Sequence, residues 1–204
     1  MHNDPTAAIS VCVRSHRRLV ETVADVDDAI ARRPSLLPDW TVGHVLTHVA
    51  RNADGHARRL LGSLRGEEVP RYPDEHPRDA DIEAGAGRPA AELLADVMES
   101  AARLEKVWRQ CEDAGWPNAE LLAGDGWTTR QSPVRRLREV EVHHVDLGLA
   151  YTCADWPDDY LAWELPRTIA ALPKRVPDPA DRRRLLAWVI GRGDLPADLR
   201  VDPW

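Results

Sequence analysis

Phenylalanine is absent from this chain of 204 residues, lysine occurs only as Lys106 and Lys174, and there are three cysteines. Cys12, Cys111 and Cys153 lie far apart and form no CxxC pair, so they provide neither a disulfide framework nor a zinc–thiolate site. This cysteine usage predicts a reduced, cytoplasmic setting. The N-terminus lacks the layout of a signal peptide, and no apolar run is long enough to span a bilayer.

Basic residues are outnumbered by acidic ones, at 27 Lys and Arg against 34 Asp and Glu, which gives a formal net charge of −7. This balance predicts no nucleic-acid partner and no docking on an anionic membrane. The sequence also lacks the GxSxG, GxGxxG, Walker-A and HExxH motifs. Serine hydrolases, dinucleotide-binding enzymes, P-loop proteins and zincin proteases are therefore disfavoured.

Apolar residues recur at helical spacing along most of the chain, and Asp4–Pro5 and Ser132–Pro133 are typical starts of helices. We expect four helices, at 5–32, 41–62, 89–115 and 132–150, with a long surface loop over 63–88. This pattern predicts a mainly α protein whose first domain, residues 1–152, is a four-helix bundle.

Residues 153–204 have a different character, because prolines punctuate them. Pro157 and Pro179 each open a short helix in our interpretation, and Pro166 interrupts the first of these. We expect a small helical or α/β unit packed on the bundle.

The fourth predicted helix carries a concentration of metal-binding residue types. Glu139 and His143 are four residues apart and therefore share one face of a helix, with Asp146 on the same face. Such a pair can bind one metal ion without bending the helix. Glu141 and His144, three residues apart, form a competing pair, and periodicity alone does not decide which pair faces inward.

The second predicted helix adds His44 and His48, either of which would complete a set of three ligands. Three nitrogen and oxygen ligands leave one coordination position open, which is the pattern of catalytic zinc sites. The competing interpretation is an ordinary solvated pair of side chains on a helix surface. The histidines without a partner pattern are expected on the surface, and these are His2, His16, His56 and His76.

Residues 40–54, WTVGHVLTHVARNAD, resemble the second-helix motif of the DinB-like metal-binding bundles, and more narrowly the N-terminal domain of mycothiol-dependent maleylpyruvate isomerases. In that motif a Trp opens the helix and the metal-binding His follows eight residues later, which is His48 here. Residues 138–147, REVEVHHVDL, are similar to the family's fourth-helix motif, whose ligands correspond to Glu139 and His143. Asp146 matches an Asp of the same motif.

The C-terminal segment 185–194 resembles the closing helix motif of the family, in which an arginine reaches toward the active site. That resemblance makes Arg192 a candidate to hold a substrate carboxylate. The family's C-terminal domain is usually longer and carries several strands. The shorter unit here leaves the metal ligands untouched but affects any substrate contact that those strands would supply.

The resemblance implies a divalent metal, with Zn2+ preferred although nickel, iron or cobalt also suit these ligands, and mycothiol as the thiol co-substrate. The metal would deprotonate the thiol, and the thiolate would add to the cis double bond of an unsaturated dicarboxylate and leave after rotation. Asp146 would orient a ligand or handle a proton. Two alternatives stay open: a mycothiol S-transferase acting on a small-molecule electrophile, and a non-enzymatic metal-binding regulatory module.

Overall fold

The computed structural model describes residues 4–70, 75–118, 128–194, 197–199 and 201, and side chains at 75–77 are outside the description. The α-helices are α1 (Pro5–Val23), α2 (Asp28–Ala31), α3 (Val42–Leu64), α4 (Glu75–Ala86), α5 (Ala90–Asp113), α6 (Ser132–Asp146), α7 (Asp158–Arg175) and α8 (Pro179–Val189). Two 3-10 helices, η1 (Thr129–Gln131) and η2 (Cys153–Asp155), flank α6. No β-strand occurs among the described residues, so the mainly α prediction is confirmed.

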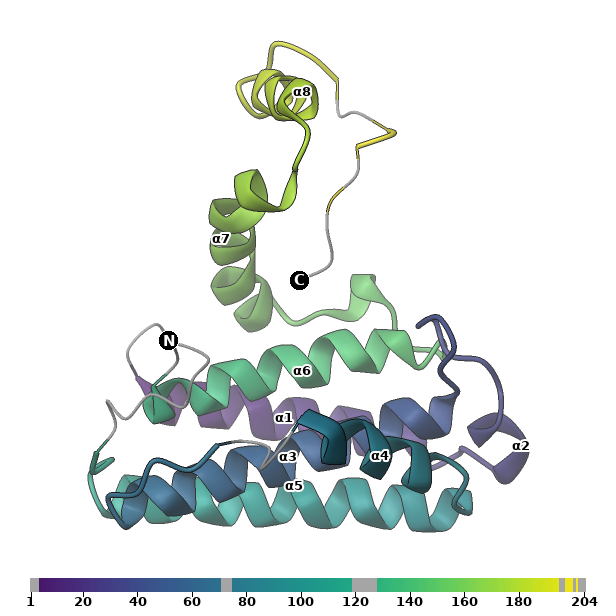
Figure 1. The fold of residues 1–204 in the computed structure, drawn as a ribbon, viewed down its shortest axis with the longest axis vertical. Coiled ribbons are helices and arrows are strands. Elements are labelled where there is room, and N and C mark those ends of the chain that lie inside the picture. Colours follow the sequence, from purple (N-terminus) through teal and green to yellow (C-terminus); the bar gives the residue numbers. More distant parts are fainter. Residues whose placement is uncertain (1–3, 71–74, 119–127, 195–196, 200, 202–204) are drawn as a thin grey trace. The chain divides into compact units, whose positions relative to one another are not determined.

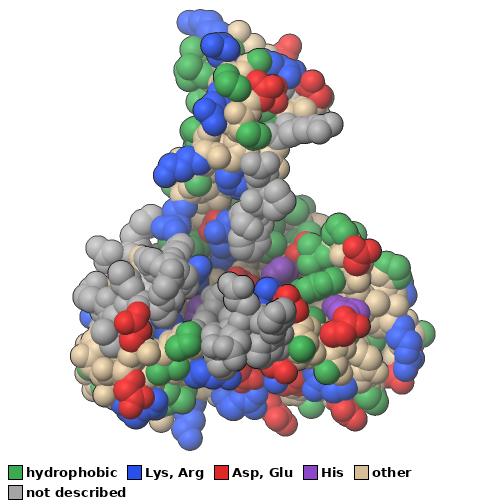
Figure 2. Space-filling model, viewed as in Figure 1, with side chains coloured by type: hydrophobic (Ala, Val, Ile, Leu, Met, Phe, Trp, Pro, Cys, Tyr) green, Lys and Arg blue, Asp and Glu red, His purple; other side chains and the backbone are tan. Residues whose placement is uncertain are grey.

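The first of two compact units, residues 1–157, contains the four long helices α1, α3, α5 and α6, with α4 lying along α3 (Figure 1). Aliphatic side chains from these helices fill its interior. The core includes Leu19, Val23, Val42, Val45, Leu46, Val49, Leu93, Val97 and Val140. Basic and acidic side chains are interspersed on the face shown in Figure 2. No helix within the described ranges is long and apolar enough to cross a membrane.

Two helices end earlier than the sequence pattern predicts. α1 stops at Val23 rather than near residue 32, because the side chain of Asp27 accepts a hydrogen bond from the Ile30 amide and starts the short α2. α6 stops at Asp146 rather than near residue 150, because Gly148 adopts a left-handed backbone with φ of 65°. Such a glycine is a common helix terminator.

The prediction of a surface loop over 63–88 is wrong for its second half, where α4 forms. The sequence of α4 has no regular apolar stripe, and Ile82 is its most deeply buried large side chain. Pro77 lies in the first turn, where the lack of an N–H donor costs little. Periodicity could not reveal this helix because it packs through few side chains.

α4 approaches α3 closely at Gly43. A Cβ atom built on Gly43 would lie 2.2 Å from the carbonyl oxygen of Ala86 and 3.3 Å from that of Ala31. Real Cβ atoms do not approach an oxygen so closely, so glycine at this position sets the distance between the two helices.

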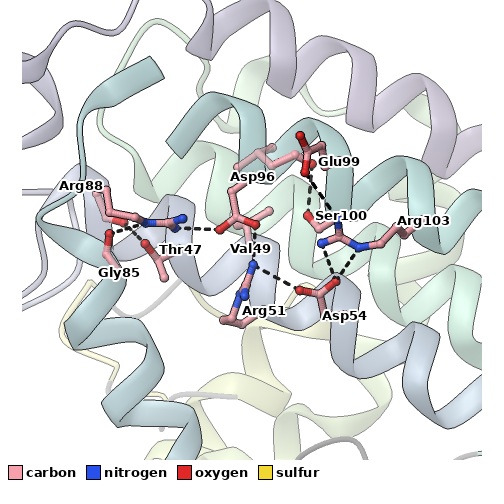
Figure 3. A network of polar contacts seen from close by, with 12 residues as sticks. Thr47, Val49, Arg51, Asp54, Gly85, Arg88, Asp96, Glu99, Ser100 and Arg103 are labelled. Carbon is pink, nitrogen blue, oxygen red and sulfur yellow. Dashed lines mark hydrogen bonds and ion pairs between the residues drawn. The ribbon is translucent and has the colours of Figure 1, made fainter. Parts of the chain in front are cut away.

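Ion pairs bind α5 to α3 and to the end of α4 (Figure 3). Asp96 accepts hydrogen bonds from Arg51 of α3 and from Arg88, the latter at 2.7 Å. Arg88 also donates to the Gly85 carbonyl at 3.0 Å, and Arg103 pairs with Asp54 at 2.9 Å. This network fixes the α4–α5 connection against the bundle.

The second unit, residues 158–204, contains α7 and α8. α7 continues through Pro166 and Pro173, so the predicted interruption at Pro166 is wrong, and the helix accommodates the loss of these backbone donors. The domain boundary predicted at 152/153 lies five residues before the division between the units. Residues up to 157 join the first unit, where Trp156 donates from Nε1 to the Glu141 carbonyl at 3.1 Å.

Candidate metal centre

The start of α3 decides which of His44 and His48 faces α6. Thr41 caps the helix, and its backbone N–H donates to Nδ1 of His44 at 3.1 Å. The other nitrogen of His44, Nε2, lies 3.2 Å from a carboxylate oxygen of Glu83 on α4. His44 therefore completes a capping box, and His48, one turn later and 4% exposed, points to α6.

His48, Glu139 and His143 bring one potential ligand atom each into a cluster in which all three atoms lie within 4.8 Å of one another. The Oε2 atom of Glu139 lies 3.2 Å from Nε2 of His48 and 3.6 Å from Nε2 of His143. In the part of the chain that the structure describes, no other group of three or more histidine, cysteine or acidic side chains meets in this way. α3 and α6 thus converge on one possible cation site.

The charges in this cluster are strongly coupled. Burial alone would raise the pKa of Glu139, but hydrogen bonds from His143 and His48 outweigh burial and hold that pKa well below its ordinary value. Burial lowers the pKa of His48. Burial also acts against protonation of His143, but Asp146 and Glu139 outweigh it and raise its pKa to about 9. The metal-free site therefore holds a carboxylate, a neutral imidazole and an imidazolium.

Asp146 lies beside His143, as the spacing predicts. Its Oδ2 atom is 2.8 Å from Nδ1 of His143, so the nitrogen that faces away from Glu139 donates to a carboxylate. This carboxylate–histidine arrangement is the usual support of a metal-binding imidazole, because it fixes the tautomer and the ring orientation. The ring of His48 packs edge-on against that of His143, with centroids 4.6 Å apart.

The competing pair, Glu141 and His144, lies on another face of α6 and is almost fully buried. Glu141 accepts hydrogen bonds from Ser15, from Arg18 at 2.7 Å and from the Tyr151 hydroxyl at 2.5 Å. His144 stacks on Tyr151 with ring centroids 3.7 Å apart. These contacts bind α6 to α1 and to the segment after α6, so the pair serves packing.

Arg78 of α4 is next to the cluster, although the sequence pattern places it in a surface loop. Its Nη2 atom lies 3.5 Å from Nδ1 of His48. The loop predicted over 63–88 gave no reason to place it against His48, whereas the helix α4 beside α3 brings it there. Arg192 is predicted, like Asp146, as a site residue. It follows α8 in the second unit and is exposed, and its Nη1 atom donates to the Gly191 carbonyl at 3.3 Å.

Two histidines predicted on the surface are buried instead. His16 lies between α1, α5 and α6, where Nδ1 is 2.9 Å from a carboxylate oxygen of Glu105 and Nε2 accepts from Arg136 at 3.1 Å. His56 lies 2.9 Å from the Ser132 hydroxyl. Both predictions failed because their partners are distant in sequence. His2 and the side chain of His76 are outside the described residues.

Comparisons with known proteins place this geometry in context. Residues 12–148 match the family described as "Mycothiol maleylpyruvate isomerase N-terminal domain". A crystal structure of a mycothiol-dependent maleylpyruvate isomerase is 29% identical, with a TM-score of 0.73 over 82% of this chain and 68% of that chain. A histidine-to-alanine mutant of such an isomerase is 28% identical, with a TM-score of 0.72 and the same coverage.

A comparison with functionally curated proteins gives no match. The family match includes all of α3, α5 and α6, and hence the three clustered side chains. This chain therefore belongs to the family that carries the mycothiol maleylpyruvate isomerase N-terminal domain.

Proposed function

We propose that the protein is a metal- and mycothiol-dependent cis–trans isomerase that acts on an unsaturated dicarboxylate of the maleylpyruvate type. The observation that carries the proposal is the convergence of His48, Glu139 and His143 within a bundle of this family. Two imidazoles and one carboxylate form a donor set that suits Zn2+ and leaves a coordination position for a thiol. The hydrogen bond from His143 to Asp146 supports the same assignment.

A zinc ion held by these side chains would stabilise the thiolate form of mycothiol at neutral pH. Glu139 would offset part of the positive charge of the metal ion. Asp146 holds a proton of His143 on Nδ1, so that Nε2, once deprotonated, would present its lone pair to the metal. His143 would have to release its Nε2 proton to become a ligand, which would link metal affinity to pH.

Two arginines are candidates to bind the carboxylates of the substrate. Arg78 contacts Nδ1 of His48 in the structure. When Nε2 of His48 serves as a ligand, its imidazole proton resides on Nδ1, which can then no longer accept from Arg78. The guanidinium would thus turn to an anionic group at the centre. Arg192 in the second unit is the other candidate, on the resemblance of residues 185–194 to the family motif.

The first test is the metal content of the purified protein by elemental analysis, together with turnover of maleylpyruvate in the presence of mycothiol. We expect about one zinc per chain in the wild type and none in His48→Ala. We also expect cis–trans conversion that requires mycothiol without consuming it. A wild type free of metal after preparation with Zn2+ would refute the centre, and a metal-loaded protein without isomerase activity would refute the reaction.

Transfer of the thiol to an electrophile is a second candidate reaction, and one observation favours it. The alignment with the isomerase structure leaves about a third of that chain without a counterpart, because 68% of it is covered. The part of a pocket that contacts substrate can therefore differ here while the metal site is kept. Net consumption of mycothiol, with a stable thioether as product, would distinguish this reaction from isomerisation.

A further inference from the structure

Arg136 lies one helical turn from the clustered ligands and is fully buried, with 0% of its surface exposed. Its Nη1 atom donates to the Val49 carbonyl at 2.8 Å and to Oδ1 of Asn52 at 3.0 Å. Both acceptors belong to α3, whereas Arg136 belongs to α6. The side chain therefore cross-links the two helices that carry His48, Glu139 and His143.

Two side-chain pairs, Arg136–Asn52 and Glu139–His48, link α6 to α3, and we call each pair a rung. Arg136 precedes Glu139 by three residues on α6, and Asn52 follows His48 by four residues on α3. One helical turn on each helix thus separates the Arg136–Asn52 rung from the Glu139–His48 rung. A slip of one helix by a single residue, about 1.5 Å, would break both rungs together.

The remaining helices hold the guanidinium in place. Nε of Arg136 donates to Nε2 of His16 on α1, and Nδ1 of His16 contacts Glu105 on α5 at 2.9 Å. Burial lowers the pKa of His16 to about 4, so its ring is neutral and can accept from Arg136 while donating to Glu105. The chain of contacts therefore runs through all four long helices of the bundle.

Stability alone does not account for a buried guanidinium at this place. Withdrawal of a charge from water costs free energy, and apolar replacements of buried charged groups are often neutral or stabilising. The rigid fork of donors on an arginine instead holds two acceptors at a defined separation. One acceptor is the Val49 carbonyl, which directly follows His48 in the sequence. The other is Asn52, which lies one helical turn after His48.

We propose that Arg136 is a positioning residue for the metal centre, which sets the register of α3 against α6 and so the separation of His48 from Glu139 and His143. This inference rests on the proposed function. In physical terms, the rung of Arg136 keeps the ligands preorganised, so that binding of a divalent cation does not have to order the two helices.

The test is titration of the full-length protein with Co2+, whose visible absorption reports the geometry of its ligands. We compare the wild type with Arg136→Met and Arg136→Lys, and follow folding by circular dichroism and urea. Arg136→Met should weaken Co2+ binding about 10- to 100-fold and change the visible spectrum. Arg136→Lys, which keeps a donor that can reach α3, should recover part of the affinity.

Arg18→Met is the matched control. Arg18 also bonds a glutamate of α6, Glu141, but it joins α6 to α1 rather than to α3. This variant should lose stability and keep the Co2+ affinity and spectrum of the wild type. If Arg136→Met does not fold, Asn52→Ala removes the α3 half of the rung, and it should weaken Co2+ binding in the same direction.

The results of these titrations distinguish loss of the positioning role of Arg136 from absence of the metal centre. Wild-type protein that binds Co2+, together with folded Arg136→Met or Asn52→Ala of equal affinity and unchanged spectrum, would overturn the positioning role alone. Equal losses of affinity in Arg136→Met and Arg18→Met would also overturn it, because they would indicate general destabilisation. Wild-type protein that binds neither Co2+ nor Zn2+ would refute the proposed centre and this inference with it.

Discussion

Glu139 and His143 lie on one face of α6, and Glu141 and His144 lie on another. The carboxylate of Glu139 meets two imidazoles, whereas that of Glu141 accepts from two hydroxyls and a guanidinium. The neighbouring histidines differ just as much, since the pKa of His143 rises to about 9 and that of His144 falls to about 4. Residue type alone therefore does not determine the role of these side chains.

The difference between the two faces lies in the groups that donate to each carboxylate, and these groups decide whether a cation can bind there. The oxygens of Glu141 accept hydrogen bonds from Ser15 and Arg18 of α1 and from Tyr151, groups that keep their protons at neutral pH. A metal would have to displace these hydrogen bonds. The donors to Glu139 are imidazoles, which can lose a proton and become ligands themselves. Four variants test this contrast, beginning with the largest expected effect.

Glu139→Gln should lower Zn2+ affinity by more than about 100-fold and abolish mycothiol-dependent turnover, because an amide replaces the one carboxylate of the three proposed ligands. Calorimetric titration with Zn2+ measures the affinity. Glu141→Gln is the control, and it should keep a stoichiometry near one zinc per chain. Equal zinc binding by both variants would remove the distinction between the two faces.

Asp146→Asn should weaken Zn2+ binding by about 10- to 100-fold, because His143 loses the carboxylate that orients it. The same change should lower the pKa of His143 from about 9 in metal-free protein, since Asp146 stabilises the imidazolium. Proton NMR titration of the His143 ring measures this pKa. An unchanged pKa would show that Asp146 does not support the ring in solution.

Glu141→Gln should reduce the free energy of unfolding by about 3 kcal/mol, because Arg18 loses a buried anionic partner. Urea unfolding of the metal-free protein measures the loss. The effect should appear in stability and not in zinc stoichiometry, which is the reverse of the result for Glu139→Gln. A stable Glu141→Gln protein with impaired zinc binding would contradict the packing role.

His144→Gln should make stability less sensitive to acid. Burial and the charge of Arg18 lower the pKa of His144 to about 4 from an ordinary value of 6.5. The contribution of the neutral ring to stability is thus complete above pH 6.5 and is lost as the pH falls toward 4. The slope from this one group reaches about 1.4 kcal/mol per pH unit. Urea unfolding of metal-free protein at pH 7, 6 and 5 should show a shallower decline in the variant.

Sequence reasoning predicted the helical bundle well, because α1, α3, α5 and α6 bury aliphatic stripes that are visible as periodicity. It also found the residues that cluster, but it needed the family resemblance to prefer His48 over His44 and Glu139 over Glu141. Helical spacing gives the relative angles of side chains around one helix, not the direction of the neighbouring helix. That direction depends on contacts between distant segments.

The features that were missed have no local signal. Arg136 stands among Arg135 and Arg138, and nothing in this run shows that one of the three is fully buried. Arg78 comes within reach of His48 only because α4 lies against α3. In both cases tertiary packing, rather than local propensity, determines the environment of the side chain.

The close approach of Gly43 to Ala86 constrains the position of α4 and not that of the three clustered side chains on α3 and α6. A single methyl group at position 43 would act as a wedge that moves α4, and Arg78 with it, away from α3. His48, Glu139 and His143 would keep their places, because α3 and α6 hold them without α4. A single substitution at position 43 would therefore change the surroundings of the candidate site and leave its three clustered side chains in place.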